Sequence, residues 1–253
     1  MKKMMIALLL LTAPASVLAG GEHSCGKIDC YKAKTGLDDK ASLQRGVKLF
    51  VNYCMGCHSA RFMSYQRMAK DLDLSHEMVL QNLMFTDGNI GDYMTISMTE
   101  KDAKKWFGTP PPDLSLVARS RGTDWLYTYL KTFYIDEKRP FGVNNLTFSD
   151  VGMPHVFAGL EGMKKAIFRT VEEKQGSETS KISVFDKFET VSEGSMSPAR
   201  YDQAVLDLVN FLDYTGEPAK LVRYGVGVKV VLFLIILLIP AYLMKKEFWK
   251  DIH

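Results

Sequence analysis

One five-residue segment, Cys54-Met55-Gly56-Cys57-His58, constrains this chain more than any other feature. Two cysteines three residues apart place their sulfurs on one side of a helical turn, and the histidine that follows presents its imidazole nearby. This spacing is typical of covalent haem attachment, in which each thiol forms a thioether and the histidine binds the iron. We therefore expect one covalently bound haem c, attached through Cys54 and Cys57, with His58 as an axial ligand.

Two other chemistries use cysteines at this spacing. A thioredoxin-like redox disulfide needs only the two cysteines, but it gives His58 no role, and the strand-helix context of such a motif is missing. A zinc site would combine Cys54 and Cys57 with Cys25 and Cys30, whose four-residue gap is unusual for zinc ligands. Haem attachment is favoured, which leaves Cys25 and Cys30 either in a disulfide or as free thiols.

The N-terminal residues have the pattern of a secretory signal peptide. Two lysines precede an apolar run over residues 4–11, which is too short to cross a bilayer as an ordinary anchor. Val17 and Ala19 place small side chains where a signal peptidase cleaves. We expect a signal peptide over residues 1–19 and an exported domain over residues 20–222; the alternative is an uncleaved N-terminal anchor.

The C-terminal region contains a second, longer apolar run. It extends from Tyr224 to Met244, 21 residues that span about 31 Å as a helix, which matches the hydrocarbon core of a bilayer. We expect a transmembrane helix over residues 223–245, in which Pro240 is tolerated, and a cytoplasmic tail over residues 246–253. Lysines and a tryptophan follow the run, which predicts a single pass through the inner membrane with the haem domain in the periplasm. A buried core helix is the alternative.

Composition excludes other classes of protein. The 253 residues are 47% hydrophobic and 24% charged, which argues against wholesale disorder and against a protein with many membrane spans. The net charge of +3 comes from scattered residues without a long basic run. We therefore expect no nucleic-acid partner.

Helical signals dominate the expected exported domain, so we expect a mostly α fold. Asp38 and Asp39 precede apolar residues at helical spacing that continue up to Asn52. The other expected helices begin at Ser or Thr caps: Ser75–Met84, Thr99–Phe107, Thr123–Phe133 and a last helix that starts at Ser197-Pro198 and ends at Gly216.

Two regions carry further expectations. Residues 134–195 are rich in turn formers and polar side chains, which predicts surface loops rather than long regular elements, inserted outside the haem core. The last helix is expected to bury Tyr201 and the apolar residues that follow it. Its polar residues, including Asp207 and Asn210, are expected on the other faces.

The second axial ligand is not decided by the haem motif. Among the 14 methionines, two stand out by context: Met153 in Val-Gly-Met-Pro-His and Met196 in Gly-Ser-Met-Ser-Pro. Composition does not choose between them. Ligation by histidine and methionine raises the reduction potential of a haem, which suits an electron carrier.

These residues resemble those of the cytochrome c1 family, the haem subunit of the ubiquinol:cytochrome c oxidoreductase (cytochrome bc1) complex, in its bacterial form. The resemblance covers nearly the whole chain after the signal peptide and rests on these segments: ASLQRG at 41–46, FVNYCMGCHS at 50–59, PPDLS at 111–115 with Arg119 and Arg121, GMP at 152–154, and Arg223-x-Gly225 before the apolar run. It implies a class I cytochrome c-like haem domain with loop insertions, plus one C-terminal transmembrane helix.

The resemblance also implies roles for single residues. It matches Met196, rather than Met153, to the family's axial methionine on the loop before the last amphipathic helix. Three haem-lining residues of the family correspond to Pro111, Pro112 and Leu114, and the arginine that meets a haem propionate corresponds to Arg119. Arginine suits a propionate because it stays charged and holds a carboxylate with two donors.

The implied function is a relay of single electrons from the Rieske iron-sulfur protein to a soluble or membrane-bound cytochrome c, beside cytochrome b. The chain would then be a non-catalytic subunit of an oxidoreductase. Two alternatives stay open: a stand-alone membrane-anchored cytochrome c, and a haem protein whose haem senses a ligand or only supports the fold.

Overall fold

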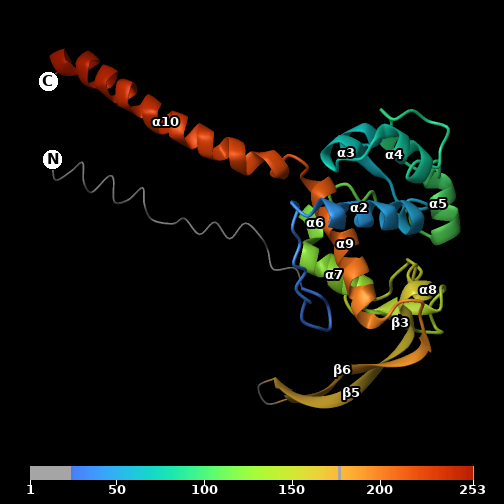
Figure 1. Ribbon diagram of the computed structural model, residues 1–253. Coiled ribbons are helices and arrows are strands. Elements are labelled where there is room, and N and C mark those ends of the chain that lie inside the picture. The colour runs from blue at the N-terminus through green and yellow to red at the C-terminus, as the bar shows by residue number, and fades with distance from the viewer. Residues whose placement is uncertain (1–23, 176–177, 253) are drawn as a thin grey trace.

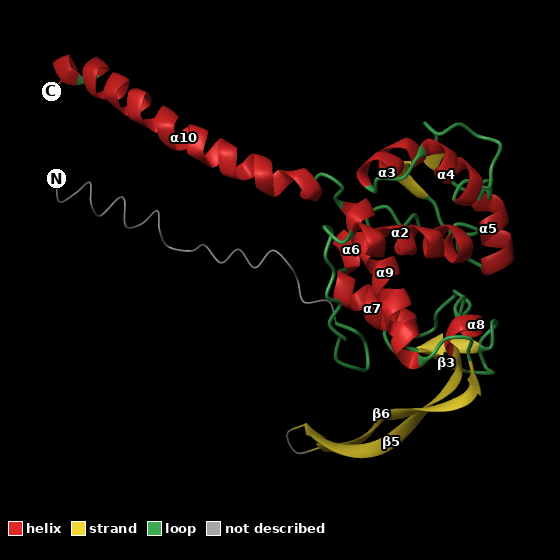
Figure 2. Cartoon of the chain, viewed as in Figure 1, coloured by secondary structure: helices red, strands yellow, loops and turns green. Residues whose placement is uncertain are grey.

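The computed structural model describes residues 24–175 and 178–252 (Figure 1). The expected signal peptide over residues 1–19 lies outside the described residues. The described part consists of a helical body, a long two-stranded arm and one projecting C-terminal helix (Figure 2). The expectation of a mostly α fold with one apolar C-terminal helix is confirmed.

Two long helices form the centre of the helical body. Helix α2 (Lys40–Leu49) begins where the Asp39 side chain accepts a hydrogen bond from the backbone N–H of Ser42, as expected of a cap. Helix α9 (Pro198–Gly216) crosses α2 (Figure 1). The shorter helices are α3 (Tyr65–Asp71), α4 (His76–Asn82), α5 (Glu100–Phe107), α6 (Val117–Arg121), α7 (Thr123–Lys131) and α8 (Ala158–Glu161).

The boundaries of the expected helices agree closely with the sequence patterns, whereas the short helices α3, α6 and α8 were not predicted. Ser75 and Thr99 accept backbone hydrogen bonds at the starts of α4 and α5, as expected from their positions. Helix α7 ends at Lys131, two residues earlier than expected, because Phe133 belongs to a strand. Glu217-Pro218 separates α9 from the next helix.

Three antiparallel pairs of strands complete the described residues. They are β1 (Ala60–Ser64) with β2 (Tyr93–Met94), β3 (Phe133–Ile135) with β4 (Val143–Asn145), and β5 (Gly162–Gln175) with β6 (Glu178–Glu193). The first two pairs are short and lie against the helical body. The third pair forms the arm that extends from that body (Figure 2).

The arm contradicts the expectation of surface loops over residues 134–195. Its strands are the longest in the described chain, and two bulges interrupt their pairing. Phe185 and Phe188 would point to opposite faces of a regular strand, yet their ring centroids lie 4.8 Å apart. The bulge between them, at Asp186, returns both rings to one face. Bulges therefore disrupted the period of two by which strands are recognised.

The main hydrophobic core lies between α2 and α9. Leu43, Val47 and Phe50 of the first segment pack with Leu208 and Phe211 of the second. At the crossing, a Cβ atom added to Gly46 would come within 2.2 Å of the Asp207 carbonyl oxygen. Glycine is thus required there because the two backbones touch.

Two polar residues of α9 that were expected away from its buried face, Asp207 and Asn210, instead lie inside the protein. Asp207 and Asn210 are each only 2% exposed. The Asp207 carboxylate accepts hydrogen bonds from Arg45 and from the Ser42 hydroxyl. The Asn210 side-chain amide accepts a hydrogen bond from the Gly36 N–H and donates one to the Gly36 carbonyl. The expectation was wrong because partners on α2 and the segment before it satisfy these groups inside the protein.

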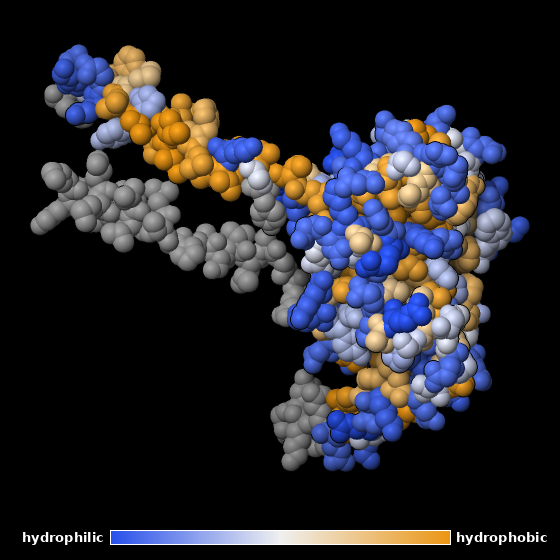
Figure 3. All heavy atoms as spheres, in the orientation of Figure 1, coloured by the Kyte–Doolittle hydropathy of each residue, from blue (hydrophilic) through white to orange (hydrophobic). Residues whose placement is uncertain are grey.

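Helix α10 (Lys220–Phe248) projects from the body. Its segment Gly225–Phe248 contains an 18-residue stretch with a mean hydropathy of 2.6, none of it buried in the described protein, so the helix is long and apolar enough to cross a membrane (Figure 3). The expected span over residues 223–245 lies within this helix, and Pro240 does not end it. A short 3₁₀ turn, η2 (Lys250–Ile252), follows.

Candidate haem site

The haem motif begins where α2 changes its winding. Helix α2 continues directly into η1, a π-helical segment (Phe50–Cys54) that ends at the first cysteine of the motif. The backbone N–H groups of Cys57 and His58 both donate to the Cys54 carbonyl, at 3.0 and 2.8 Å. This tight turn holds the two cysteines and the histidine in one fixed unit.

Neither motif cysteine belongs to a disulfide, and their environments differ. Cys54 is buried, whereas Cys57 is half-buried. Burial, assisted by the nearby Cys57 sulfur, raises the pKa of Cys54 to about 12. A thioether carries no charge, so the apolar surroundings that disfavour a thiolate are compatible with an attached haem.

The His58 ring is oriented by a backbone carbonyl. Its Nδ1 lies 2.7 Å from the Pro112 oxygen, which has no proton to give, so Nδ1 carries the proton and donates. The other nitrogen, Nε2, then has the lone pair that binds a metal. Burial lowers the pKa of His58, which favours this neutral form, although the Pro112 bond and Asp113 oppose the shift. These residues therefore fit a haem iron.

The Pro-rich segment is fixed beside the motif. The Leu114 N–H donates to the Ser59 carbonyl at 2.8 Å, and the Arg61 N–H donates to the Asp113 carboxylate at 3.0 Å. Burial tends to raise the pKa of Asp113, but hydrogen bonds from Ser115 and Arg61 outweigh it and hold the pKa below its usual value. The expected lining residues are thereby held next to His58.

A cavity of about 450 Å³ opens beside the motif. Cys57 borders it together with Arg61, Pro111 and Pro112. Leu114 instead packs against the main core. The structure therefore brings Pro111 and Pro112 to the cavity beside Cys57, and Pro112 to His58, whereas Leu114 does not border this cavity.

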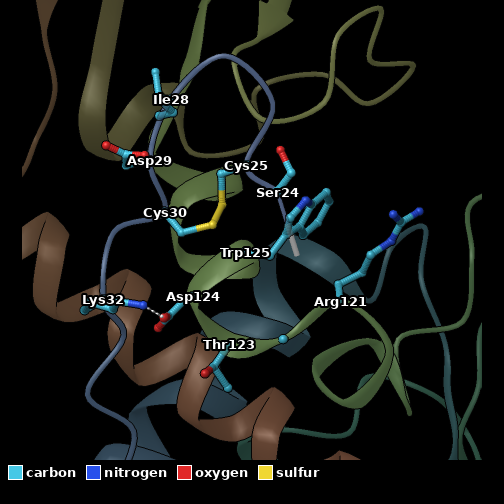
Figure 4. A pocket seen from close by; sticks show the side chains of 11 residues that line it. Ser24, Cys25, Ile28, Asp29, Cys30, Lys32, Arg121, Thr123, Asp124 and Trp125 are labelled. Carbon is cyan, nitrogen blue, oxygen red and sulfur yellow. Dashed lines mark hydrogen bonds and ion pairs between the residues drawn. A yellow bond between two sulfur atoms is a disulfide. The ribbon is translucent and has the colours of Figure 1, made fainter. Parts of the chain in front are cut away.

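The two arginines of α6 have different surroundings. Arg119 is exposed, and its aliphatic stem packs against Gly216 at the end of α9. The Arg121 guanidinium lies 5.2 Å from the centre of the Trp125 ring. Both Arg121 and Trp125 border a second cavity, of about 710 Å³ (Figure 4). The role expected of Arg119 toward a propionate stays a prediction.

Cys25 and Cys30 form a disulfide at the edge of that second cavity (Figure 4). The bond excludes the zinc alternative, because two of the four proposed ligands are consumed. The described residues also hold no group of three or more His, Cys, Asp or Glu side chains arranged to bind a metal ion.

The two candidate methionines lie in different parts of the protein. Met196 is partly buried against the main core, and its backbone N–H donates to the Leu160 carbonyl at 3.0 Å. Met153 packs in a smaller cluster with Phe133, and its sulfur accepts a hydrogen bond from the Tyr129 hydroxyl at 3.4 Å. Met196 thus shares the core that contains Cys54, and Met153 does not.

A model of the Cytochrome C1 family matches residues 31–252. The chain belongs to the cytochrome c1 family. It is 50% identical to a cytochrome c1 of Allochromatium vinosum over the full length of both chains, and 42% identical to a protein named ammonia monooxygenase gamma subunit from Nitrosomonas europaea over 98% of this chain and 97% of that one. It is also 25% identical to a cytochrome b/c1 of Bradyrhizobium diazoefficiens, over 92% of this chain and 36% of the other.

Membership of the cytochrome c1 family implies a c-type haem, in agreement with the motif at residues 54–58. The sequence did not reveal the Pro112 carbonyl as the partner of His58, because a backbone acceptor leaves no signature in side-chain identity. Nor did it reveal Arg61 and Asp113 as the pair that fixes the Pro-rich segment. The charged pair offers only a weak signal, because it joins residues 52 positions apart.

Proposed function

We propose that the chain is the electron-relay subunit of a cytochrome bc1 complex, which receives electrons from the Rieske iron-sulfur protein and delivers them to a cytochrome c. One haem c, bound through Cys54 and Cys57 with His58 and Met196 as axial ligands, would supply one-electron chemistry at its iron. The observation that carries the proposal is the bond between His58 Nδ1 and the Pro112 oxygen, which leaves Nε2 to bind a metal.

The choice of Met196 is supported by what surrounds each methionine. The Met153 sulfur accepts a hydrogen bond from the Tyr129 hydroxyl and packs in a cluster separate from the main core, so reaching the iron would require it to give up that bond. Met196 lies against the core that contains Cys54, on the segment that leads into α9. A sulfur ligand raises the reduction potential, which favours acceptance of an electron from an iron-sulfur donor.

The remaining residues would hold and shield the cofactor. Pro111, Pro112 and Leu114 would line it, with their segment fixed by the bonds to Ser59 and Arg61, and Arg119 would pair with a propionate. Helix α10 would anchor the domain in the inner membrane with the haem on the periplasmic side, because the lysines lie at its C-terminal end. Cytochrome b and the Rieske protein would then be neighbours in the same membrane.

The covalent attachment is tested by intact mass spectrometry of the purified chain. We expect the mass of residues 20–253 plus one haem, and haem absorbance that survives denaturing electrophoresis. Cys57→Ala is expected to leave at most a single thioether, through Cys54. An attached haem that persists when both cysteines are replaced would overturn the assignment.

Membership of the complex is tested by gentle detergent extraction and affinity purification of the tagged chain. We expect cytochrome b and a Rieske protein in constant ratio, and quinol-dependent reduction of the haem. Recovery of the chain alone, with the haem intact, would instead favour a stand-alone membrane-anchored cytochrome.

A further inference from the structure

A buried ionic cluster lies behind the segment that carries Met196. Glu161, the last residue of α8, is at its centre, and its side chain is 14% exposed. One carboxylate oxygen contacts the ammonium of Lys164, which is equally buried and also donates to the Lys131 carbonyl at 2.7 Å. The other oxygen lies 3.0 Å from His155 Nε2, in a side chain only 5% exposed. Burying several charged groups together costs desolvation free energy unless they are paired, so a functional role for the cluster is worth seeking.

The carboxylate draws together three separate parts of the chain. His155 belongs to the loop before α8 and stacks on Phe133, with 5.0 Å between the ring centroids. Lys164 belongs to β5, the first strand of the arm. Helix α8 packs against α9, and burial together with the neighbouring Glu161 carboxylate raises the pKa of Tyr201, a residue of α9, well above its usual value. Loop, arm and α9 thus meet at Glu161.

Helix α8 in turn holds the backbone of the Met196 segment. The N–H groups of Ser195 and Met196 donate to the carbonyls of Gly159 and Leu160, both at 3.0 Å. A Cβ atom added to Gly194 would lie 2.1 Å from the Leu160 oxygen, so the two backbones are in direct contact. A movement of α8 would therefore move the Met196 backbone with it.

We infer that Glu161 is a positioning residue for the Met196 side chain: its buried carboxylate, bound to Lys164 and facing His155, fixes α8, and α8 fixes the segment that carries the axial sulfur. The inference rests on the proposed ligation by Met196. Four residues form only one turn of helix, so hydrogen bonds within α8 give it little stability of its own. The ionic cluster supplies the missing rigidity.

The test compares Glu161→Gln with a matched control, Glu189→Gln, which removes an exposed carboxylate from β6. The full chain with its haem is studied in detergent by the sulfur-to-iron charge-transfer band of the oxidised form, by redox titration and by far-UV circular dichroism. In Glu161→Gln we expect at least about a tenfold larger fraction of oxidised chain without the band, and a lower reduction potential. The control should match the wild type.

The order of events in urea separates positioning from general stability. In Glu161→Gln the charge-transfer band should disappear at a lower urea concentration than helicity, whereas in the wild type the two should be lost together. An unchanged band, potential and urea profile would overturn the inference. If Glu161→Gln does not accumulate, Glu161→Asp, which keeps the charge but shortens its reach, is measured in the same way with the same expected changes and the same criterion for rejection.

Met196→Leu distinguishes failure of this inference from failure of the proposed ligation. A band that is present in the wild type and absent in Met196→Leu establishes the ligand, and a wild-type result for the Glu161 variants then rejects the positioning role alone. A band that survives in Met196→Leu rejects the ligand and the positioning role together.

Discussion

The helical body and the arm differ in how closely their elements pack and in how much of their side chains they bury. In the body, α2 and α9 approach so closely that Gly46 touches the opposing backbone, and even Asp207 and Asn210 of α9 are buried with partners. In the arm, β5 and β6 pair chiefly with each other, and Ile182 and Val191 remain exposed. His58 is held by the body, whereas Met196 lies where the arm returns to it. The two proposed ligands therefore depend on structural support of different strength.

The largest effect is expected at the crossing of α2 and α9. Gly46→Val would place a branched side chain where even a Cβ atom would lie 2.2 Å from the Asp207 oxygen. The helices must separate, at a cost of about 3 kcal/mol in the free energy of unfolding. Urea denaturation followed by circular dichroism measures this cost. Gly91→Ala is the control, because its nearest neighbour would be 4.0 Å away; equal stability of the two variants would show that the crossing is not tight.

A smaller loss is expected at the buried carboxylate of the same crossing. Asp207→Asn removes the charge that accepts hydrogen bonds from Arg45 and Ser42, and should cost about 2 kcal/mol of unfolding free energy. The exposed Asp186→Asn on the arm serves as control. Equal, small losses of unfolding free energy in the two variants would show that the buried Asp207 carboxylate does not stabilise the helical body.

The Pro-rich segment predicts a dependence on pH. The pKa of Asp113 is lower in the folded protein than its ordinary value of 3.8, so its stabilising effect is complete above that ordinary value and is lost as the pH falls through the lower pKa of the folded protein. Asp113→Asn should therefore lower stability by about 1 kcal/mol at neutral pH and by little at strongly acidic pH. Urea titrations of both proteins across this range measure the difference. A difference that does not change with pH would contradict the hydrogen bonds described.

The smallest effect is expected at the outer part of the arm. Replacement of residues 172–181 by an Asn-Gly turn leaves the paired Phe168 and Phe185 in place. The unfolding free energy of the body should change by less than about 0.5 kcal/mol, and the haem spectrum should not change. A large loss of stability or of haem would show that the arm is part of the haem domain rather than an extension of it.

The body could be predicted from the sequence better than the arm. Residues Leu43, Val47 and Phe50 recur at helical spacing after the Asp39 cap, so α2 and its buried face were foreseen. The arm was missed, because its bulges place Phe185 and Phe188 on one face and break the alternation of a strand.

The candidate site was predictable only in part. The Cys54, Cys57 and His58 pattern is local, so the hypothesis of haem attachment needs only its spacing, and the family match supports a c-type haem. The carbonyl of Pro112 that orients His58, and the burial of Asp207 and Asn210, depend on segments distant in sequence that meet only in the folded protein. The cluster around Glu161 was not anticipated either, since a glutamate beside a lysine ordinarily indicates a solvated surface.

Redox titration with absorption spectra of the wild type, Met196→Leu and Met153→Leu shows whether a haem iron is held between His58 and Met196. We predict that Met196→Leu loses the sulfur-to-iron charge-transfer band and has a markedly lower reduction potential, whereas Met153→Leu keeps the band and the potential of the wild type. A wild-type band and potential in Met196→Leu, with their loss in Met153→Leu, would contradict the account.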